Sequence, residues 1–268
     1  MREGNTVDGD VGPTDHRPWA TPARPWSWRQ TWHDLLFLHW PVPAGMVRGL
    51  VPRELEIDRR EGQAWVGVIP FWMSGVTLRR WPAVPGLSRF PELNVRTYVA
   101  LGDKPGVWFF SLDAASRLAV AVARRLFHLP YVHARMTATT STDCAEGTDA
   151  DGVAASGRAT AGVQYRSERK SGEGFVARYR PSGPVARSAK GSLAHFLTER
   201  YCLYAATPRG LGRAEIHHAP WPLQPASVSV ARNDMLAVHG IQVAGEPVAH
   251  YARKIDVRVW SLAPVRPG

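Results

Sequence analysis

Short segments rich in β-branched and aromatic residues, each bounded by glycine or proline, constrain the fold of this chain most strongly. Such punctuation is typical of β-strands joined by turns. Six segments have this pattern: 63–70, 92–101, 106–113, 133–140, 162–170 and 174–180. Helices are expected at 32–37, 114–127 and 193–201, the last beginning after Ser192 as N-cap. The sequence therefore predicts a β-rich α+β domain with a few peripheral helices.

The helix expected at 114–127 carries an apolar stripe. Val122 lies four residues after Leu118, and Arg125 and Leu126 lie three and four residues after Val122, which places them on one side of a helix. Pro130 ends the segment, because proline disfavours helical geometry in the residue before it. The stripe is expected to be buried against the strands.

The chain is long enough for one barrel-sized domain. At 268 residues it exceeds the commonest domain length, but β-barrels of this size often form a single unit. Residues 1–27 have no apolar period and are expected to form a disordered N-terminal tail. One domain is expected over residues 28–262, followed by a C-terminal tail at 263–268. The polar stretch 144–158 is expected to be a loop within this domain.

The basic charge does not by itself indicate a nucleic-acid or membrane partner. The formal net charge of +10 comes almost entirely from arginines, which are spread along the chain. No nucleic-acid partner and no membrane partner are therefore expected. The two cysteines lie far apart and no signal-peptide pattern is present, so we expect a cytoplasmic protein without a metal or a cofactor.

Several phrases of the sequence resemble one known family. They are LLFLHWPVP, VGVIPFWMSGV, PGLSRFPELNVRTYV, DKPGVWFFSLDA, RRLFHLPY, GSLAHFLTERYCLY and EIHHAPWPLQPA. Together they are similar to the uncharacterised DUF2071 family, also called YqjF-like, over about residues 28–235. That family is grouped with the acetoacetate decarboxylase-like superfamily, so the resemblance implies an antiparallel β-barrel or cone that encloses a pocket. Closed barrels of this size hold one small ligand.

The resemblance also shows that this chain lacks the two lysines of the decarboxylase pattern. The decarboxylases carry Gly-Arg-Glu, two residues, Gly, an apolar residue and then Pro-Lys-Lys. Here Arg124 and Pro130 keep their separation, but Tyr131 and Val132 replace the two lysines. Decarboxylation of acetoacetate through an imine needs an amine, so it is not expected. Tyr131 and His128 are instead candidate catalytic residues, as an oxyanion donor and a proton-transfer group, or else they are structural residues of a turn.

The strand expected at 92–101 has one polar face. Asn94, Arg96 and Tyr98 alternate with apolar residues, and Ser111 and Asp113 share one face of the next strand. Arg96 is expected either to pair with Asp113 in the barrel or to bind a carboxylate in bidentate fashion. These five residues are the predicted substrate-binding set.

Two weaker clusters lie near the C-terminus. Glu215 and His217 share a strand face, and with His218 they have the chemistry of metal ligands, although a complete ligand set is not visible. Glu199 and Arg200 end the last predicted helix, where such a pair more often anchors a helix to a sheet.

The sequence thus predicts a pocket-containing protein that binds a small anionic or apolar metabolite. The alternative is a lyase, hydrolase or isomerase that works without an imine, using Tyr131 and His128 with Arg96. The oligomeric state is left open.

Overall fold

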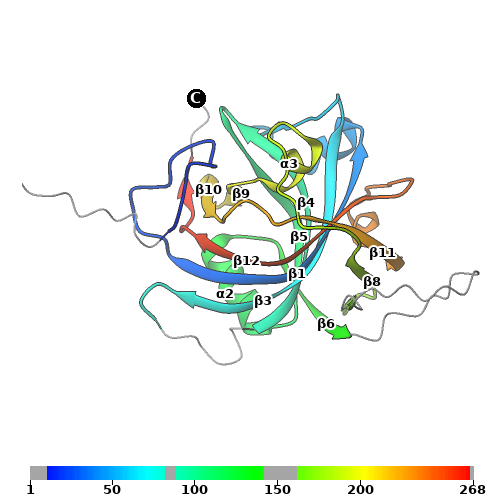
Figure 1. Ribbon diagram of the computed structural model, residues 1–268. Helices are drawn as coiled ribbons and strands as arrows, with labels where there is room; N and C mark the ends of the chain where they lie inside the picture. Colours follow the sequence, from blue (N-terminus) through cyan, green and yellow to red (C-terminus); the bar gives the residue numbers. More distant parts are fainter. Residues whose placement is uncertain (1–10, 82–88, 142–161, 266–268) are drawn as a thin grey trace, which may run out of the picture.

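The computed structural model of the chain describes residues 11–81, 89–141 and 162–265 (Figure 1). Its strands are β1 Trp28–Val42, β2 Glu56–Ile57, β3 Ala64–Leu78, β4 Arg89–Leu101, β5 Lys104–Ala114, β6 Tyr131–Ser141, β7 Gly162–Arg169, β8 Gly174–Pro181, β9 Cys202–Thr207, β10 Gly210–His217, β11 Gln224–Asn233, β12 Val248–Val259 and β13 Ala263–Pro264. Its helices are α1 Ala44–Arg48, α2 Arg117–Phe127, α3 Leu193–Thr198 and the short 3₁₀ helix η2 Ala237–His239. The loop predicted at 144–158 lies outside the described residues.

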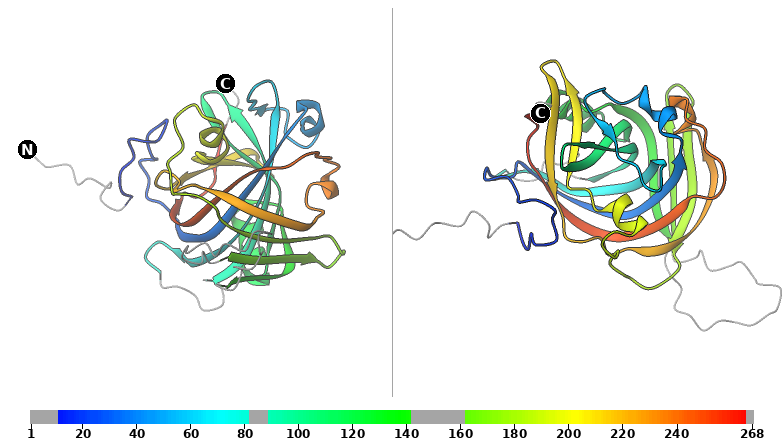
Figure 2. Two further views of the ribbon diagram at one scale, coloured as in Figure 1. Left: turned by 45° about the vertical axis from the view of Figure 1, so that its right-hand side comes forward. Right: turned by 90° about the horizontal axis from the view of Figure 1, so that it is seen from above.

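The strands close into a barrel. In the order β5-β6-β7-β8-β11-β12-β1-β3-β4, each strand pairs with the next, and a β4–β5 pairing closes the nine-stranded ring. Seen from above, the strands curve around a common axis (Figure 2). The predicted β-rich barrel with few helices is therefore confirmed.

A second, smaller ring shares part of this barrel. The strand β9 pairs with β5 at Val107 and Trp108, and β10 pairs with the far end of β12 at Ile216. Because β9 also pairs with β10, the strands β5, β9, β10, β12, β1, β3 and β4 form a closed ring of their own. The five strands common to both rings therefore have protein on both faces.

Two hydrophobic clusters occupy the two faces of the shared strands. On β4, Leu93, Val95 and Val99 belong to the cluster inside the nine-stranded ring, whereas Phe90 and Tyr98 belong to the cluster on the other side. The period-two alternation predicted for this strand is thus present. Both of its faces are buried.

The burial of both faces of β1 explains why the helix predicted at 32–37 is wrong. Residues 32–37 are part of β1 and not a helix. The apolar run LLFLHW alternates between the two clusters, and a continuous apolar run of this length has no period that separates a buried strand from a buried helix. All six predicted strands are present, and α2 and α3 occupy the other two predicted helical positions. Side chains of Ser116 and Ser192 cap them.

The apolar stripe of α2 is not buried as predicted. Leu118 and Leu126 are more than half exposed, and Val120 is the buried residue of the helix. Ala119, Val122, Ala123 and Phe127 of the helix line a cavity, so α2 covers this cavity instead of packing into a filled core. Its apolar side chains therefore line the cavity and its rim.

The predicted N-terminal tail is wrong from residue 11 onward. Arg17 is buried, and its guanidinium donates to the carboxylate of Glu215 and to the carbonyl of Ile216. Trp26 is buried as well, and the indole of Trp260 donates to the carbonyl of Arg24 over 2.7 Å. The predicted C-terminal tail likewise begins with β13, which pairs with β10.

No helix in the described ranges is both long enough and apolar enough to cross a lipid bilayer.

Candidate functional site

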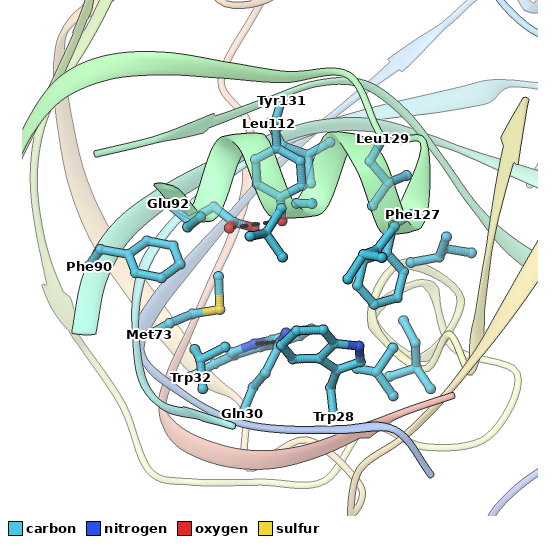
Figure 3. A pocket seen from close by; sticks show the side chains of 18 of the residues that line it. Trp28, Gln30, Trp32, Met73, Phe90, Glu92, Leu112, Phe127, Leu129 and Tyr131 are labelled. Atoms are coloured by element: carbon cyan, nitrogen blue, oxygen red, sulfur yellow. Dashed lines mark hydrogen bonds between the residues drawn. The ribbon is translucent and has the colours of Figure 1, made fainter. Parts of the chain in front are cut away.

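A cavity of about 310 Å³ lies inside the smaller ring, between the shared sheet and α2 (Figure 3). Its lining is mainly aromatic and aliphatic. The lining residues are Trp28, Gln30, Trp32, Met73, Val76, Thr77, Leu78, Trp81, Phe90, Glu92, Asn94, Phe109, Leu112, Ala119, Val122, Ala123, Leu126, Phe127, Leu129, Tyr131, Leu203, Ile216 and Val259. Segments far apart in the sequence therefore build one apolar chamber.

Glu92 is the one ionisable carboxyl group in this lining. It lies on β4 on the same face as Asn94, two residues further on, and it is 2% exposed. The hydroxyl of Tyr131 donates to its Oε2 over 3.1 Å. Burial raises the pKa of Glu92 from 4.5 to about 8, while hydrogen bonds from Tyr131 and Asn94 oppose the rise. At neutral pH this carboxyl group is mainly protonated and the cavity is uncharged.

The turn after α2 positions Tyr131. His128 ends the helix in the left-handed conformation with φ 51°, and β6 begins at Tyr131, opposite Leu112 of the parallel strand β5. The guanidinium of Arg124 donates to the Tyr131 carbonyl over 2.6 Å, which ties the helix to the strand. Burial raises the pKa of the Tyr131 hydroxyl well above 10, so it acts as a hydrogen-bond donor.

The two predicted catalytic residues are therefore separated. Tyr131 points into the cavity beside Glu92 (Figure 3), whereas His128 is exposed and does not line the cavity. The left-handed backbone of a helix C-cap carries the chain outward at His128.

Of the predicted substrate-binding residues on β4, only Asn94 lines the cavity. Arg96 lies deeper, where its Nη2 donates to the carbonyl of Leu197 over 3.2 Å and to the Tyr98 hydroxyl over 3.3 Å. That hydroxyl also contacts Nε2 of His39 at 2.6 Å. Within the described part of the chain, Arg96 has no carboxylate partner.

The predicted pairing of Arg96 with Asp113 is wrong. Asp113 lies opposite Leu93 across the β4–β5 ladder, so it points into the nine-stranded ring, away from Arg96. Its partner is Arg169 of β7, with Nη2 at 2.6 Å from Oδ1 and Nε at 3.1 Å from Oδ2. Arg169 also donates to the Ser111 hydroxyl over 2.7 Å. Ser111 and Asp113 therefore belong to a buried structural network.

The cluster around Glu215 is committed to ion pairs and hydrogen bonds. Glu215 contacts Arg17 at 3.2 Å and Arg213 at 3.1 Å, and it accepts a hydrogen bond from the Trp19 indole over 2.7 Å. Burial lowers the pKa of His217 from 6.5 to about 4. Among the described residues, no group of three or more His, Cys, Asp and Glu side chains is arranged to hold a metal ion.

Glu199 and Arg200 also act within the fold. Glu199 accepts hydrogen bonds from the Trp221 amide over 2.9 Å and from the Tyr201 hydroxyl. Arg200 pairs with Asp58 at 2.5 Å and donates to the carbonyl of Phe196. Neither residue lines the cavity.

Sequence reasoning missed Glu92, although a signal was present. Glu92 opens the strand segment 92–101 and shares the period-two face of Asn94 and Arg96. The tryptophans Trp28 and Trp32 were missed for a different reason, because their segment was not recognised as a strand from residue 28.

Comparisons with known proteins agree with this architecture. The model of the DUF2071 family, described as an uncharacterized conserved protein, matches residues 29–256. The uncharacterized protein YqjF of Bacillus subtilis (strain 168) is 42% identical over 246 residues, which cover 91% of this chain and 94% of that protein.

Solved structures share the fold at low sequence identity. An acetoacetate decarboxylase-like enzyme from Sphingomonas wittichii RW1 is similar with a TM-score of 0.59 and 14% identity, over 94% of this chain and 98% of that one. The enduracididine biosynthesis enzyme MppR, complexed with pyruvate, is similar with a TM-score of 0.60 and 11% identity, over 91% and 92%. These likenesses confirm the acetoacetate decarboxylase-like barrel.

Proposed function

The chain belongs to the DUF2071 family of uncharacterised conserved proteins, and on that premise we propose that it binds a small, mainly apolar and uncharged molecule in the cavity of the smaller ring. The observation that carries the proposal is the lining. Aromatic and aliphatic side chains surround one protonated carboxyl group, and no described lining residue is Arg, Lys or His. An apolar chamber with few convergent polar groups is the usual form of a small-molecule site.

The polar groups of the cavity favour a neutral ligand over an anion. A ligand carboxylate would lose its hydration without meeting a cation, which is unfavourable in an apolar site. A carbonyl or hydroxyl group, in contrast, can accept a hydrogen bond from the protonated Glu92 or from Tyr131. Of the two ligand types expected from the sequence, the apolar one is supported.

A matched pair of ligands tests this proposal. Titration with 2-heptanone and with heptanoate at pH 7, followed by calorimetry, should give binding of the ketone and at least about tenfold weaker binding of the carboxylate. Ala123→Trp should abolish ketone binding because Ala123 lines the cavity, whereas Ala121→Trp on the exposed side of α2 should preserve it. Tighter binding of heptanoate, or ketone binding that survives Ala123→Trp, would contradict the proposal.

The contact between Glu92 and Tyr131 favours a second candidate function, proton transfer to and from a bound carbonyl compound. A carboxyl group with a pKa of about 8 can hold or release a proton near neutral pH, which suits a general base. The Glu92 carboxylate would take a proton from the carbon next to the carbonyl, which leaves an enolate whose oxygen accepts a hydrogen bond from Tyr131. After the Glu92 proton exchanges with solvent, the carboxyl group would return a proton to the same carbon and restore the ketone. No imine is required.

Exchange of solvent deuterium into bound ketone tests this second function. In D₂O the protein should accelerate the loss of the α-proton signals of 2-heptanone in NMR spectra. The rate should rise with pH up to about 8 and then level off, because the base form of Glu92 accumulates over that range. Glu92→Gln should abolish the exchange while ketone binding remains. Equal exchange rates in the parent and Glu92→Gln would exclude this role.

A further inference from the structure

Exposed apolar side chains surround the opening of the cavity. Trp81 is 71% exposed, Leu126 51% and Leu78 40%, and all three also line the cavity. Leu118, 56% exposed, lies two helical turns before Leu126 on the same side of α2. We call these four residues the mouth patch. A cluster of exposed apolar side chains is a feature of interaction sites, whereas single exposed apolar residues are not.

Arginines accompany the mouth patch. Arg80 lies next to Trp81, and Arg117, Arg124 and Arg125 are exposed on α2. The segments 72–91 and 114–141 contain no Asp or Glu. In the ranges that the structure describes, Arg80, Arg117 and Arg125 form no ion pair. Exposed arginines without an ion pair among the described residues are therefore close in sequence to the apolar residues of the mouth patch, on α2 and next to Trp81.

We propose that the mouth patch docks on the surface of an anionic lipid bilayer, with Trp81 and the leucines in the interface and the arginines at the headgroups. Tryptophan favours the membrane interface because its ring is apolar and its indole N–H is polar. The exposed side of α2 carries Leu118 together with Arg117 and Arg125, so it presents an apolar side chain and two cations to such an interface. A bilayer partner of this kind differs from the sequence-based expectation of no membrane partner.

Charge complementarity selects the bilayer over a second copy of the chain. A two-fold contact between copies would place the same patch on both sides, and the arginines of each copy would then face those of the other. Anionic headgroups instead neutralise them. Docking would bring the opening of the cavity to the lipid phase, from which an apolar ligand could enter; this last step rests on the proposed function.

Vesicle co-sedimentation of the full chain tests the docking. We expect binding to vesicles of phosphatidylcholine with phosphatidylglycerol, weak binding to phosphatidylcholine alone, and release as the salt concentration rises from about 0.1 to about 0.5 M. Arg117→Glu with Arg125→Glu should weaken binding by at least about tenfold. Trp81→Ser with Leu118→Ser should weaken it as well.

Control variants separate docking from charge and folding effects. Arg178→Glu on the outer surface of β8 and Val185→Ser, at another exposed apolar residue, should bind vesicles like the parent. Ala123→Trp should also keep vesicle binding while it loses ketone binding, so that failure of docking and failure of the proposed ligand site are distinguishable. Equal binding to both vesicle types, or no loss in the mouth-patch variants, would overturn the proposal. So would a dimer, seen by light scattering without vesicles, that Trp81→Ser converts to monomer.

Discussion

At the scale of single residues, Glu92 determines the charge of the cavity. Its carboxyl group is desolvated by the apolar lining, and two hydrogen bonds from Tyr131 and Asn94 do not offset that effect. The sequence placed Asn94 on the correct face of its strand, but it gave no measure of desolvation. Desolvation depends on Trp28, Trp32 and other side chains that the fold brings from distant segments.

The raised pKa of Glu92 predicts how the free energy of unfolding depends on pH. Between pH 4.5 and about 8 the folded protein holds this proton and the unfolded chain does not, so the contribution of Glu92 to stability falls as pH rises through that range. The total change is about 4 to 5 kcal/mol. The difference in free energy of unfolding between the parent and Glu92→Gln, from urea denaturation at pH 5, 7 and 9, should follow this decline. Glu54→Gln, at an exposed carboxylate, should run parallel to the parent; a constant difference for Glu92→Gln would contradict the burial of its charge.

Two buried arginines should respond differently to removal of their charge. Arg169→Met leaves Asp113 buried without its bidentate partner and should lower the free energy of unfolding by about 3 to 5 kcal/mol. Arg96→Met leaves no carboxylate behind and should lower it by about 1 kcal/mol, because the carbonyl of Leu197 still accepts from Tyr98. Urea denaturation of both variants at one pH measures the difference. Equal losses of stability in the two variants would contradict the assignment of Arg169, and not Arg96, as the partner of Asp113.

At the scale of elements, the sequence predicted those strands that alternate or that have clear boundaries. Strands β4 and β5 are of this kind. The strand β1 was missed because its apolar run is buried on both sides, and it also contains a bulge at Asp34, with φ 48°, that shifts the pairing with β3. The strands β9, β11 and β12 were not predicted, and of β10 only the strand position of Glu215 and His217 was expected. Charges interrupt β10 and β12, and a proline lies in β11. The strands β9 and β10 pair with each other, but other partners, such as β5 for β9 and β1 for β12, are remote in sequence.

The segment before β1 is an integral part of the fold, and a matched pair of arginines tests this. Arg17→Ala removes a buried cation from Glu215 and should lower the free energy of unfolding by about 3 kcal/mol. Arg24→Ala removes an exposed contact with the carbonyl of Ser261 and should change it by about 0.5 kcal/mol or less. Thermal and urea denaturation compare the two variants. If Arg17→Ala is as mild as Arg24→Ala, this segment does not stabilise the domain.

At the scale of the whole molecule, the resemblance predicted a barrel with a pocket, and the structure has both. It did not predict that a second ring, closed by β9 and β10, holds the pocket. That ring depends on pairings between strands more than ninety positions apart, such as Val107 with Leu203, which no local pattern reveals. The identity of the pocket-lining residues follows from this closure.

The sheet shared by the two rings has a consequence for how such a protein changes over generations. Along β4, residues 93 and 95 face the filled interior, whereas residues 92 and 94 face the cavity. Substitutions at neighbouring positions therefore act on separate properties, one on the persistence of the fold and the other on the choice of ligand. Substitutions at residues 92 and 94 can therefore change the ligand that the cavity accepts, while residues 93 and 95 on the opposite side of the same strand keep the barrel folded.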